Sequence, residues 1–549
     1  MVRIDVDGGR PLGPGARLAG WGLEKAWRLP PRRGRVRVRR AVRVPMSDGT
    51  VLLADHYTPD ADEPAATVLV RCPYGRKAPF SLLNAQVLAE RGHQVLLQSC
   101  RGTFGSGGGF APMRHEISDG RDTVAWLREQ DWFDGRLLTF GASYLGFVQW
   151  ALLRDPPPEL LGAVIQVAPH DFSRAAYRNG AFDLANFLGW SEMVAGQESP
   201  DRIRHGLRTL RPAARLTAAV AGSPLREGAR ALLGDKAPWF ESWLDHPDLT
   251  DPFWTPLQCG DALARTAVPT LLVGGWHDIF LAQTLEQYRV LRSREVPVRL
   301  LVGPWTHEQA VMKAGTVTAE SLDWLDRCLA PARPRGRSAR IWTGGGVGWQ
   351  ETGDWPPPQA GEQNWYLGPG GTLSPDHRAG DPVVFRYDPA DPTPSVGGAI
   401  MLQGGGSRDN RRLEAREDVL LFSSPPLTAP LDVRGAVTAR IALSRDNPHA
   451  DLFVRLCDVD PGGRSRNLCD GIVRMTADDP LDTVAVVDLL GIAHRFAPGH
   501  RLRVQVSGGA HPRFARNPGT GAWDAGEAEL RSTAYRVADT SHLVLPTAK

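Results

Sequence analysis

The feature that most restricts the fold is a regular alternation of apolar runs and helix-like segments between residues 35 and 170. The apolar runs are short and rich in Val and Leu, as in buried strands: ATVLVRCPY (66–74), HQVLLQSC (93–100), GRLLTFGAS (135–143) and LGAVIQVAP (161–169). Two segments between them have helical composition: VLAERG (87–92) and DGRDTVAWLREQ (119–130). Strands that alternate with helices predict a parallel sheet with helices on both faces.

The alternation stops after residue 170 and returns near residue 268. Residues 171–255 contain no convincing strand and consist of helix-like pieces with many aromatic residues. Buried strands then reappear as VPTLLVGGW (268–276) and VPVRLLVGPW (296–305), with a helical segment at 281–293 between them. An α/β fold with a helical cap inserted into its core explains this order, because an insertion whose ends lie close together leaves the core intact.

A second change of character follows the Pro- and Arg-rich segment PARPRGR (331–337). The remaining chain, beginning with RIWTGG, has short alternating strands between Gly, Pro and Asp turns, which predicts an antiparallel sandwich or jelly roll. A chain of 549 residues is too long for one core. We therefore predict four segments: a first core part at 35–170, a cap at 171–255, a second core part at 256–335 and a C-terminal jelly roll at 340–549.

The motif FGASYLG (140–146) carries the first indication of chemistry. It has the form G-x-S-x-x-G, follows a predicted strand and precedes the helical FVQWALL. The related strand–turn–helix motif of α/β-hydrolases reads G-x-S-x-G, so Gly146 comes one residue late. Such a turn raises the Ser143 hydroxyl above the edge of the sheet, where a helix N-terminus supplies N–H groups.

A serine nucleophile needs a base, and the base needs a carboxylate to orient it. Asp278 follows the strand at 268–276, and His307 follows the strand at 296–305. Ser143, Asp278 and His307 therefore occur in the chain order of an α/β-hydrolase triad, each at a strand end. His277 also follows a strand, but it adjoins Asp278, and adjacent side chains point apart, so His307 is the preferred base.

Composition excludes several other classes of protein. The formal net charge of +3 gives no case for nucleic acid or an anionic membrane, and no apolar run reaches the ~18 residues of a membrane span. The six cysteines show neither a CxxC pair nor metal-ligand spacing. We expect a cytoplasmic protein without metal or cofactor that acts on a small molecule. The oligomeric state, a homo-oligomer included, stays open.

Several longer motifs resemble the cocaine-esterase-like hydrolases (CocE/NonD family) of the Xaa-Pro dipeptidyl-peptidase group. The similarity covers about residues 38–545 and includes VRVPMSDGTVLLADHYTP, RCPYGR, RGTFGSGG, DGRDTVAWLREQDWFDGRLLTFGASYLGFVQW, GGWHD, GPWTH and GHRLRVQVSGGAHPRFARNPGTG. The resemblance implies an α/β-hydrolase core with a helical cap and a C-terminal jelly roll. It also implies that the Tyr74 hydroxyl and the Tyr144 backbone N–H donate to the oxyanion. Where relatives commonly have Q-D-x-R-G, this chain has Ser99 in place of the aspartate.

The resemblance also suggests where a substrate binds. Trp190 in FLGWS and Phe280 would form an aromatic pocket for a bulky acyl group, and His277 would add a polar contact. The residues after Asp278 are apolar, which weakens an amine-binding role like that of α-amino-acid ester hydrolases or dipeptidyl peptidases, although Glu192 and Asp183 could supply charge. A dipeptidyl peptidase and an acyltransferase remain alternatives that use the same acyl-enzyme. A non-catalytic binding protein is the alternative outside enzymes.

Overall fold

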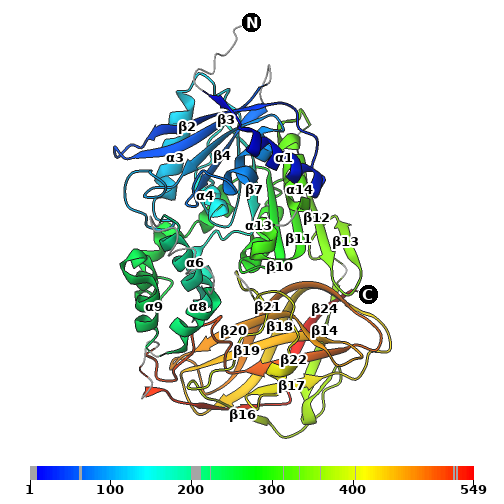
Figure 1. Ribbon diagram of the computed structural model, residues 1–549. Helices are drawn as coiled ribbons and strands as arrows, with labels where there is room; N and C mark the ends of the chain where they lie inside the picture. The colour runs from blue at the N-terminus through cyan, green and yellow to red at the C-terminus, as the bar shows by residue number, and fades with distance from the viewer. Residues whose placement is uncertain are drawn as a thin grey trace.

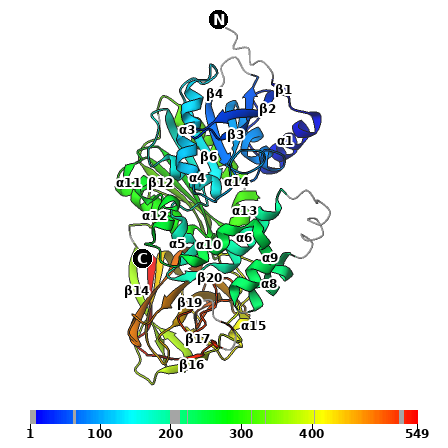
Figure 2. The same ribbon diagram turned by 90° about the vertical axis from the view of Figure 1, so that its left-hand side faces the viewer.

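The computed structural model describes residues 9–60, 65–198, 212–222, 224–312, 315–332, 334–358, 360–401, 404–522, 526 and 529–548. Figure 1 shows an α/β core at the end that carries the N-terminus and a β domain at the opposite end. Between them lie the cap helices α6 (Leu184–Gly196), α8 (Pro212–Ala221) and α9 (Leu225–Leu233). Figure 2, turned by 90°, shows the same arrangement of the three parts.

The core is built on an 11-stranded sheet with the order β1-β2-β3-β5-β4-β6-β7-β10-β11-β12-β13. Neighbours from β5 to β12 pair in parallel, and both edges of the sheet are antiparallel. The strands are β1 (Arg10–Pro11), β2 (Val36–Pro45), β3 (Val51–Pro59), β4 (Ala65–Cys72), β5 (His93–Ser99), β6 (Leu137–Ala142), β7 (Leu160–Gln166), β10 (Thr270–His277), β11 (Val298–Thr306), β12 (Arg337–Thr343) and β13 (Gly348–Thr352). Every residue of β5 and β6 is buried, which explains the apolar residues at the centre of β5 and along most of β6.

Helices on both faces of this sheet follow the strands in the βα pattern that the sequence predicts. They are α1 (Pro14–Trp27), α2 (Val87–Ala89), α3 (Glu116–Arg128), α4 (Tyr144–Leu152), α11 (Gly260–Arg265), α12 (Leu281–Ser293), α13 (His307–Met312) and α14 (Gly315–Leu329). The cap adds α5 (Phe172–Ala176) and α10 (Pro238–Asp245) to α6, α8 and α9. Aromatic rings from several of these elements, among them Phe172, Phe187 and Trp243, pack edge to face inside the cap.

The C-terminal domain holds a second 11-stranded sheet and has its own hydrophobic core. Its strands are β14 (Ala360–Gly368), β15 (Thr372–Ser374), β16 (Val383–Tyr387), β17 (Val419–Ser423), β18 (Leu431–Arg445), β19 (Ala450–Val459), β20 (Ser465–Met475), β21 (Asp482–Phe496), β22 (Arg501–Ser507), β23 (Thr533–Val537) and β24 (His542–Ala548), with the short helix α15 (Arg411–Glu414). Most pairs are antiparallel. The predicted combination of an α/β core and a C-terminal β domain is confirmed.

Several local predictions were wrong. RIWTGG was expected to open the C-terminal sheet, but β12 pairs in parallel with β11 and extends the core sheet to residue 352. The cap contains a small hairpin of β8 (Tyr177–Arg178) and β9 (Ala181–Phe182) where no strand was expected. The helix expected at 87–92 begins earlier, as a π-helical turn at Leu82–Gln86 that continues into α2.

His170, just after β7, gives the fold a pH-dependent contribution to stability. Its side chain is 1% exposed, and its Nδ1 accepts a hydrogen bond from Gln287 Nε2 at 3.2 Å, so the folded protein holds the neutral ring. Burial lowers the pKa of His170 to about 4, below the ~6.5 of an exposed histidine. As pH falls through 6.5, the unfolded chain binds the proton first, and stability is lost until about pH 4.

We expect this group to make the protein about 2 kcal/mol less stable at pH 5 than at pH 7.5. The His170→Gln variant should therefore lose less stability than wild type between these pH values, as measured by the midpoint of urea unfolding. The partly exposed His542, replaced in the same way, serves as the control. Equal pH sensitivity of wild type and His170→Gln would contradict the assignment.

Among the described residues, no helix is both long and apolar enough to cross a membrane.

Candidate active site

Ser143 lies in a tight turn between β6 and α4. Its backbone has φ +60° and ψ −121°, a left-handed conformation that costs a non-glycine residue about 1–3 kcal/mol. A Cβ on Gly141 would come within 2.3 Å of the Leu145 Cβ, and one on Gly146 within 2.2 Å of the Ala168 Cβ. The late position of Gly146 therefore has a steric reason, since α4 crosses the segment after β7 at that residue. The strained turn holds the serine at the carboxyl end of the sheet.

Asp278 and His307 are brought together by the neighbouring strands β10 and β11. Asp278 Oδ1 lies 2.7 Å from His307 Nδ1, and Asp278 Oδ2 accepts the backbone N–H of Phe280 at 2.9 Å. Asp278 is 0% and His307 5% exposed. A carboxylate that accepts at both oxygens requires Nδ1 of His307 to carry the hydrogen, so Nε2 is left with its lone pair.

The same packing unit contains the turn of Ser143 and the helix of His307. Ala142, which precedes Ser143, packs in one small cluster with Val167 and with Ala310 of α13. His307 is the first residue of α13. The predicted serine, at the end of β6, and the predicted base, at the end of β11, thus lie at the same carboxyl edge of the sheet, which is where open α/β sheets bind ligands.

Tyr74 follows β4, the strand beside β6, and its hydroxyl faces this site. Trp190 Nε1 donates to the Tyr74 oxygen at 3.0 Å. Burial raises the pKa of Tyr74 well above its usual value, and hydrogen bonding to Trp190 and to Ser143 works against part of that rise. The phenol is therefore protonated at neutral pH, and because its oxygen already accepts from Trp190, its hydrogen is available for donation.

Tyr144 has its side chain in the core. Its hydroxyl donates to Glu116 Oε1 at 2.7 Å and accepts the N–H of Met113 at 2.8 Å, and burial raises its pKa. Glu116 in turn pairs with buried Arg71 at 2.8 Å. Tyr144 is the first residue of α4, and the first N–H groups of a helix lack intrahelical acceptors. Tyr144 therefore has its backbone N–H, and not its phenol, next to Ser143.

The three predicted substrate-binding residues lie in two different environments. Trp190, 5% exposed, stacks on Tyr144 with the rings 6.3 Å apart, and Phe280 meets the His307 ring edge-on at 5.4 Å. His277 is directed to the C-terminal domain instead. Burial lowers its pKa to about 4, and the buried Asp470 opposes that shift. The two aromatics are thus next to His307 and the Tyr74 phenol, whereas the charges that act on His277 are those of Asp470, Arg455 and Arg513 in the C-terminal domain.

Sequence reasoning missed the contacts that tie the cap to the C-terminal domain beside this site. Asn186 in α6 is 1% exposed; its Oδ1 accepts the N–H of Met401 at 2.7 Å, and its Nδ2 donates to Asp183 at 2.8 Å and to the Ala399 carbonyl at 3.3 Å. A lone asparagine within an apolar helix gives no sequence signal for a partner 215 residues away.

Ser99, which stands where relatives commonly have aspartate, is also accounted for by local contacts. Its hydroxyl accepts a hydrogen bond from Arg76, and Asp55 supplies the carboxylate that pairs with the same guanidinium. Across the described residues, no cluster of three or more His, Cys, Asp or Glu side chains could hold a metal ion.

Known protein families and relatives match this chain along almost its whole length. The model of the X-Pro dipeptidyl-peptidase (S15) family matches residues 48–309, and that of the X-Pro dipeptidyl-peptidase C-terminal non-catalytic domain matches residues 335–544. Cocaine esterase of Rhodococcus sp. (strain MB1 Bresler) is 32% identical over 94% of this chain and 99% of its own.

Solved structures share the fold. An α-amino acid ester hydrolase and an aminopeptidase from a marine sediment archaeon (Thaumarchaeota) each superpose with a TM-score of 0.78 at 24% identity. Both alignments cover 93% of this chain, with 96% of the ester hydrolase and 97% of the aminopeptidase.

Proposed function

The chain belongs to the X-Pro dipeptidyl-peptidase (S15) family and is a hydrolase, and from this premise we propose that it is a serine hydrolase that cleaves esters or amides through an acyl-enzyme on Ser143. The observation that carries the proposal is the buried Asp278–His307 hydrogen bond beside a strained serine turn. Ion pairs on the protein surface are common and do not by themselves indicate catalysis. A fully buried carboxylate that fixes one imidazole tautomer at a strand end is what nucleophilic catalysis needs.

In the proposed mechanism, His307 Nε2 removes the Ser143 proton as Oγ attacks the substrate carbonyl. Asp278 stays ionised, holds the ring through Nδ1 and stabilises the imidazolium that forms. The negative charge that develops on the carbonyl oxygen is met by the Tyr74 hydroxyl and the Tyr144 N–H. His307 then protonates the leaving alcohol or amine, and the same steps with water release the acid and restore Ser143.

The acyl group that fits this site is bulky and apolar. Trp190 and Phe280, both nearly buried, flank Tyr74 and His307, and aromatic walls favour a flat or branched acyl group. Cocaine esterase, the relative at 32% identity, is named for an ester substrate, which is the bond type we propose here.

Recognition of a substrate amine fits less well. Glu192 is already paired with Arg215 at 2.6 Å. Asp183 is buried near Arg513 and Arg178, and burial raises its pKa to about 7, so the carboxyl is partly protonated at neutral pH. Two neighbouring arginines would repel an ammonium group. We therefore place esters of neutral acyl groups ahead of dipeptides or α-amino acid esters.

The proposal is tested by intact-protein mass spectrometry after incubation with a fluorophosphonate. We expect one adduct on wild type and none on Ser143→Ala, because only an activated serine reacts at neutral pH. A folded wild type that gives no adduct, or a variant that still gives one, would refute Ser143 as the nucleophile. Esters labelled in the acyl group, supplied with water alone or with added amine, then separate hydrolysis from acyl transfer.

The proposed role of Tyr74 predicts a large effect of Tyr74→Phe. Loss of one oxyanion donor should lower kcat about 10²–10³-fold with little change in KM, because the hydrogen bond strengthens in the transition state. Tyr288→Phe is the matched control: Tyr288 is also buried, but its hydroxyl contacts Asp354, in the segment after β13. An increase in KM with kcat unchanged would show that Tyr74 only binds the ground state.

A further inference from the structure

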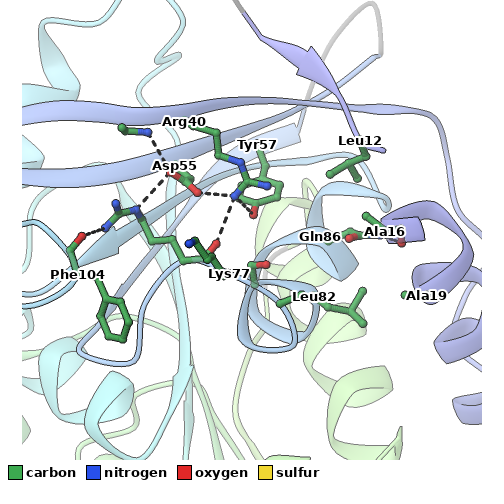
Figure 3. Close-up of a pocket in the computed structure, with 14 residues that line it drawn as sticks. Leu12, Ala16, Ala19, Arg40, Asp55, Tyr57, Lys77, Leu82, Gln86 and Phe104 are labelled. Atoms are coloured by element: carbon green, nitrogen blue, oxygen red, sulfur yellow. Dashed lines mark hydrogen bonds and ion pairs between the residues drawn. The ribbon is translucent and has the colours of Figure 1, made fainter. Parts of the chain in front are cut away.

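A cavity lies on the α/β core, apart from the proposed catalytic residues. It has a volume of about 710 Å³ and lies between α1, the bulged part of β2 and the loop that follows Tyr74. Figure 3 shows its lining, which includes none of the triad residues and neither Tyr74 nor Trp190. Volumes of this size accommodate small organic ligands.

One wall of the cavity carries an excess of positive charge. Arg40, Arg76 and Lys77 line it together with one carboxylate, that of Asp55. Asp55 is 3% exposed and fully engaged: it accepts from the Ala41 N–H at 3.0 Å, Arg40 Nη1 at 2.5 Å and Arg76 Nε at 3.3 Å. A buried carboxylate shared in this way leaves a net charge of about +2 on the wall.

Two of the cations, Arg40 and Lys77, have N–H donors available for a ligand. Every hydrogen bond that Arg40 makes with described residues uses Nη1: with Asp55, with the Tyr57 hydroxyl at 3.2 Å and with the Arg76 carbonyl at 3.3 Å. The Arg40 side chain is 53% exposed, so its Nε and Nη2 are free to donate to a ligand. Lys77 is exposed and forms no ion pair in the part of the chain that the structure describes. A guanidinium edge beside an ammonium group suits a carboxylate.

The opposite wall is apolar. Leu12, Ala16 and Ala19 come from the N-terminal segment and α1, and Leu82 from the π-helical turn (Figure 3). Ala19 is exposed and Leu12 is buried, so this wall runs from the surface inwards. A ligand that satisfies both walls has an anionic head and an apolar tail.

We propose that this cavity is a binding site for an amphipathic carboxylate, with the carboxylate held by Arg40 and Lys77 and the apolar tail against α1. Arg76 is part of the scaffold, because Asp55, Ser99 and the Phe104 carbonyl occupy its guanidinium. The site needs no reaction at Ser143 and stands apart from the proposed function.

Equilibrium dialysis with radiolabelled hexanoate tests the site, on wild type and on Ser143→Ala so that catalysis plays no part. We expect saturable binding with one site per chain, about equal in the two proteins. Lys77→Gln should weaken it about three- to tenfold, and more salt should weaken it further. Ala19→Trp, which fills the apolar mouth, should weaken it at least as much. Lys25→Gln, which removes an exposed cation of α1 outside the lining, should leave the dissociation constant unchanged.

Hexanamide, which has the same tail and no charge, should not displace hexanoate. Displacement by hexanamide at equal concentration would overturn the assigned anion recognition. Binding that both cavity variants leave unchanged would place hexanoate in another pocket, such as the acyl site, and would overturn the proposal. Absence of saturable binding to wild type would overturn it as well.

Discussion

Ser143→Ala is expected to lower kcat by about 10⁶-fold, the largest effect of any single substitution in this protein. Without Oγ there is no acyl-enzyme, and the remaining rate is what bound water achieves beside the oxyanion donors. The measurement is hydrolysis of an aryl ester under saturating substrate. Ser118→Ala, which removes a hydroxyl from α3, is the control and should keep full activity.

The same substitution should change stability very little. Alanine at φ +60° bears the same backbone strain as serine, so the turn gains no relief. Thermal unfolding of Ser143→Ala should therefore match wild type, which separates lost chemistry from lost fold. Activity of the variant above about 1% of wild type would show that another group is the nucleophile.

Asp278→Asn is expected to lower kcat by about 10⁴-fold while substrate binding persists. The asparagine can still accept the Phe280 N–H, but its amide NH₂ then faces His307 Nδ1 and forces the hydrogen onto Nε2. The ring in that tautomer cannot take the serine proton. Single-turnover kinetics should show slow acylation, and the fluorophosphonate adduct should form slowly.

The control for this variant is Asp248→Asn, a carboxylate in a surface turn that caps Thr250. It should react at the wild-type rate. Should Asp278→Asn retain a tenth or more of the wild-type kcat, the imidazole of His307 would have to be oriented by another group, and the proposed triad would fail.

The sequence was sufficient to predict the core strands and that Ser143, Asp278 and His307 lie at strand ends. The central strands are buried on both faces, so their apolar runs are unmistakable, and each of the three residues directly follows such a run. The carboxyl ends of neighbouring parallel strands meet at one edge, which is why the distance along the chain between Asp278 and His307 did not matter.

Other elements could not be predicted, because their local sequence pattern does not indicate which part of the fold they pair or pack with. β12 alternates between buried and partly exposed positions because it lies near the edge, next to antiparallel β13, and so it has the sequence of a sandwich strand. β8 and β9 are two residues each, too short for any periodicity. The buried pair of Arg71 and Glu116 is 45 residues apart along the chain, and only the packing of α3 on the sheet brings it together.

The contacts between the cap and the C-terminal domain have a consequence for biosynthesis. The carbonyls of Ala221 and Gly222 at the end of α8 each accept from Arg516 Nη2 at 2.7 Å, and Val220 contacts His511 at 3.1 Å, 291 residues later in the chain. At 5–20 residues per second, a ribosome needs roughly 15–60 s to add those residues. During that interval the rest of the core sheet is translated, Asp278 and His307 included, while the carbonyls at the end of α8 still lack these partners. We therefore expect these contacts between the cap and the C-terminal domain to form only after residues 511–516 have been synthesised.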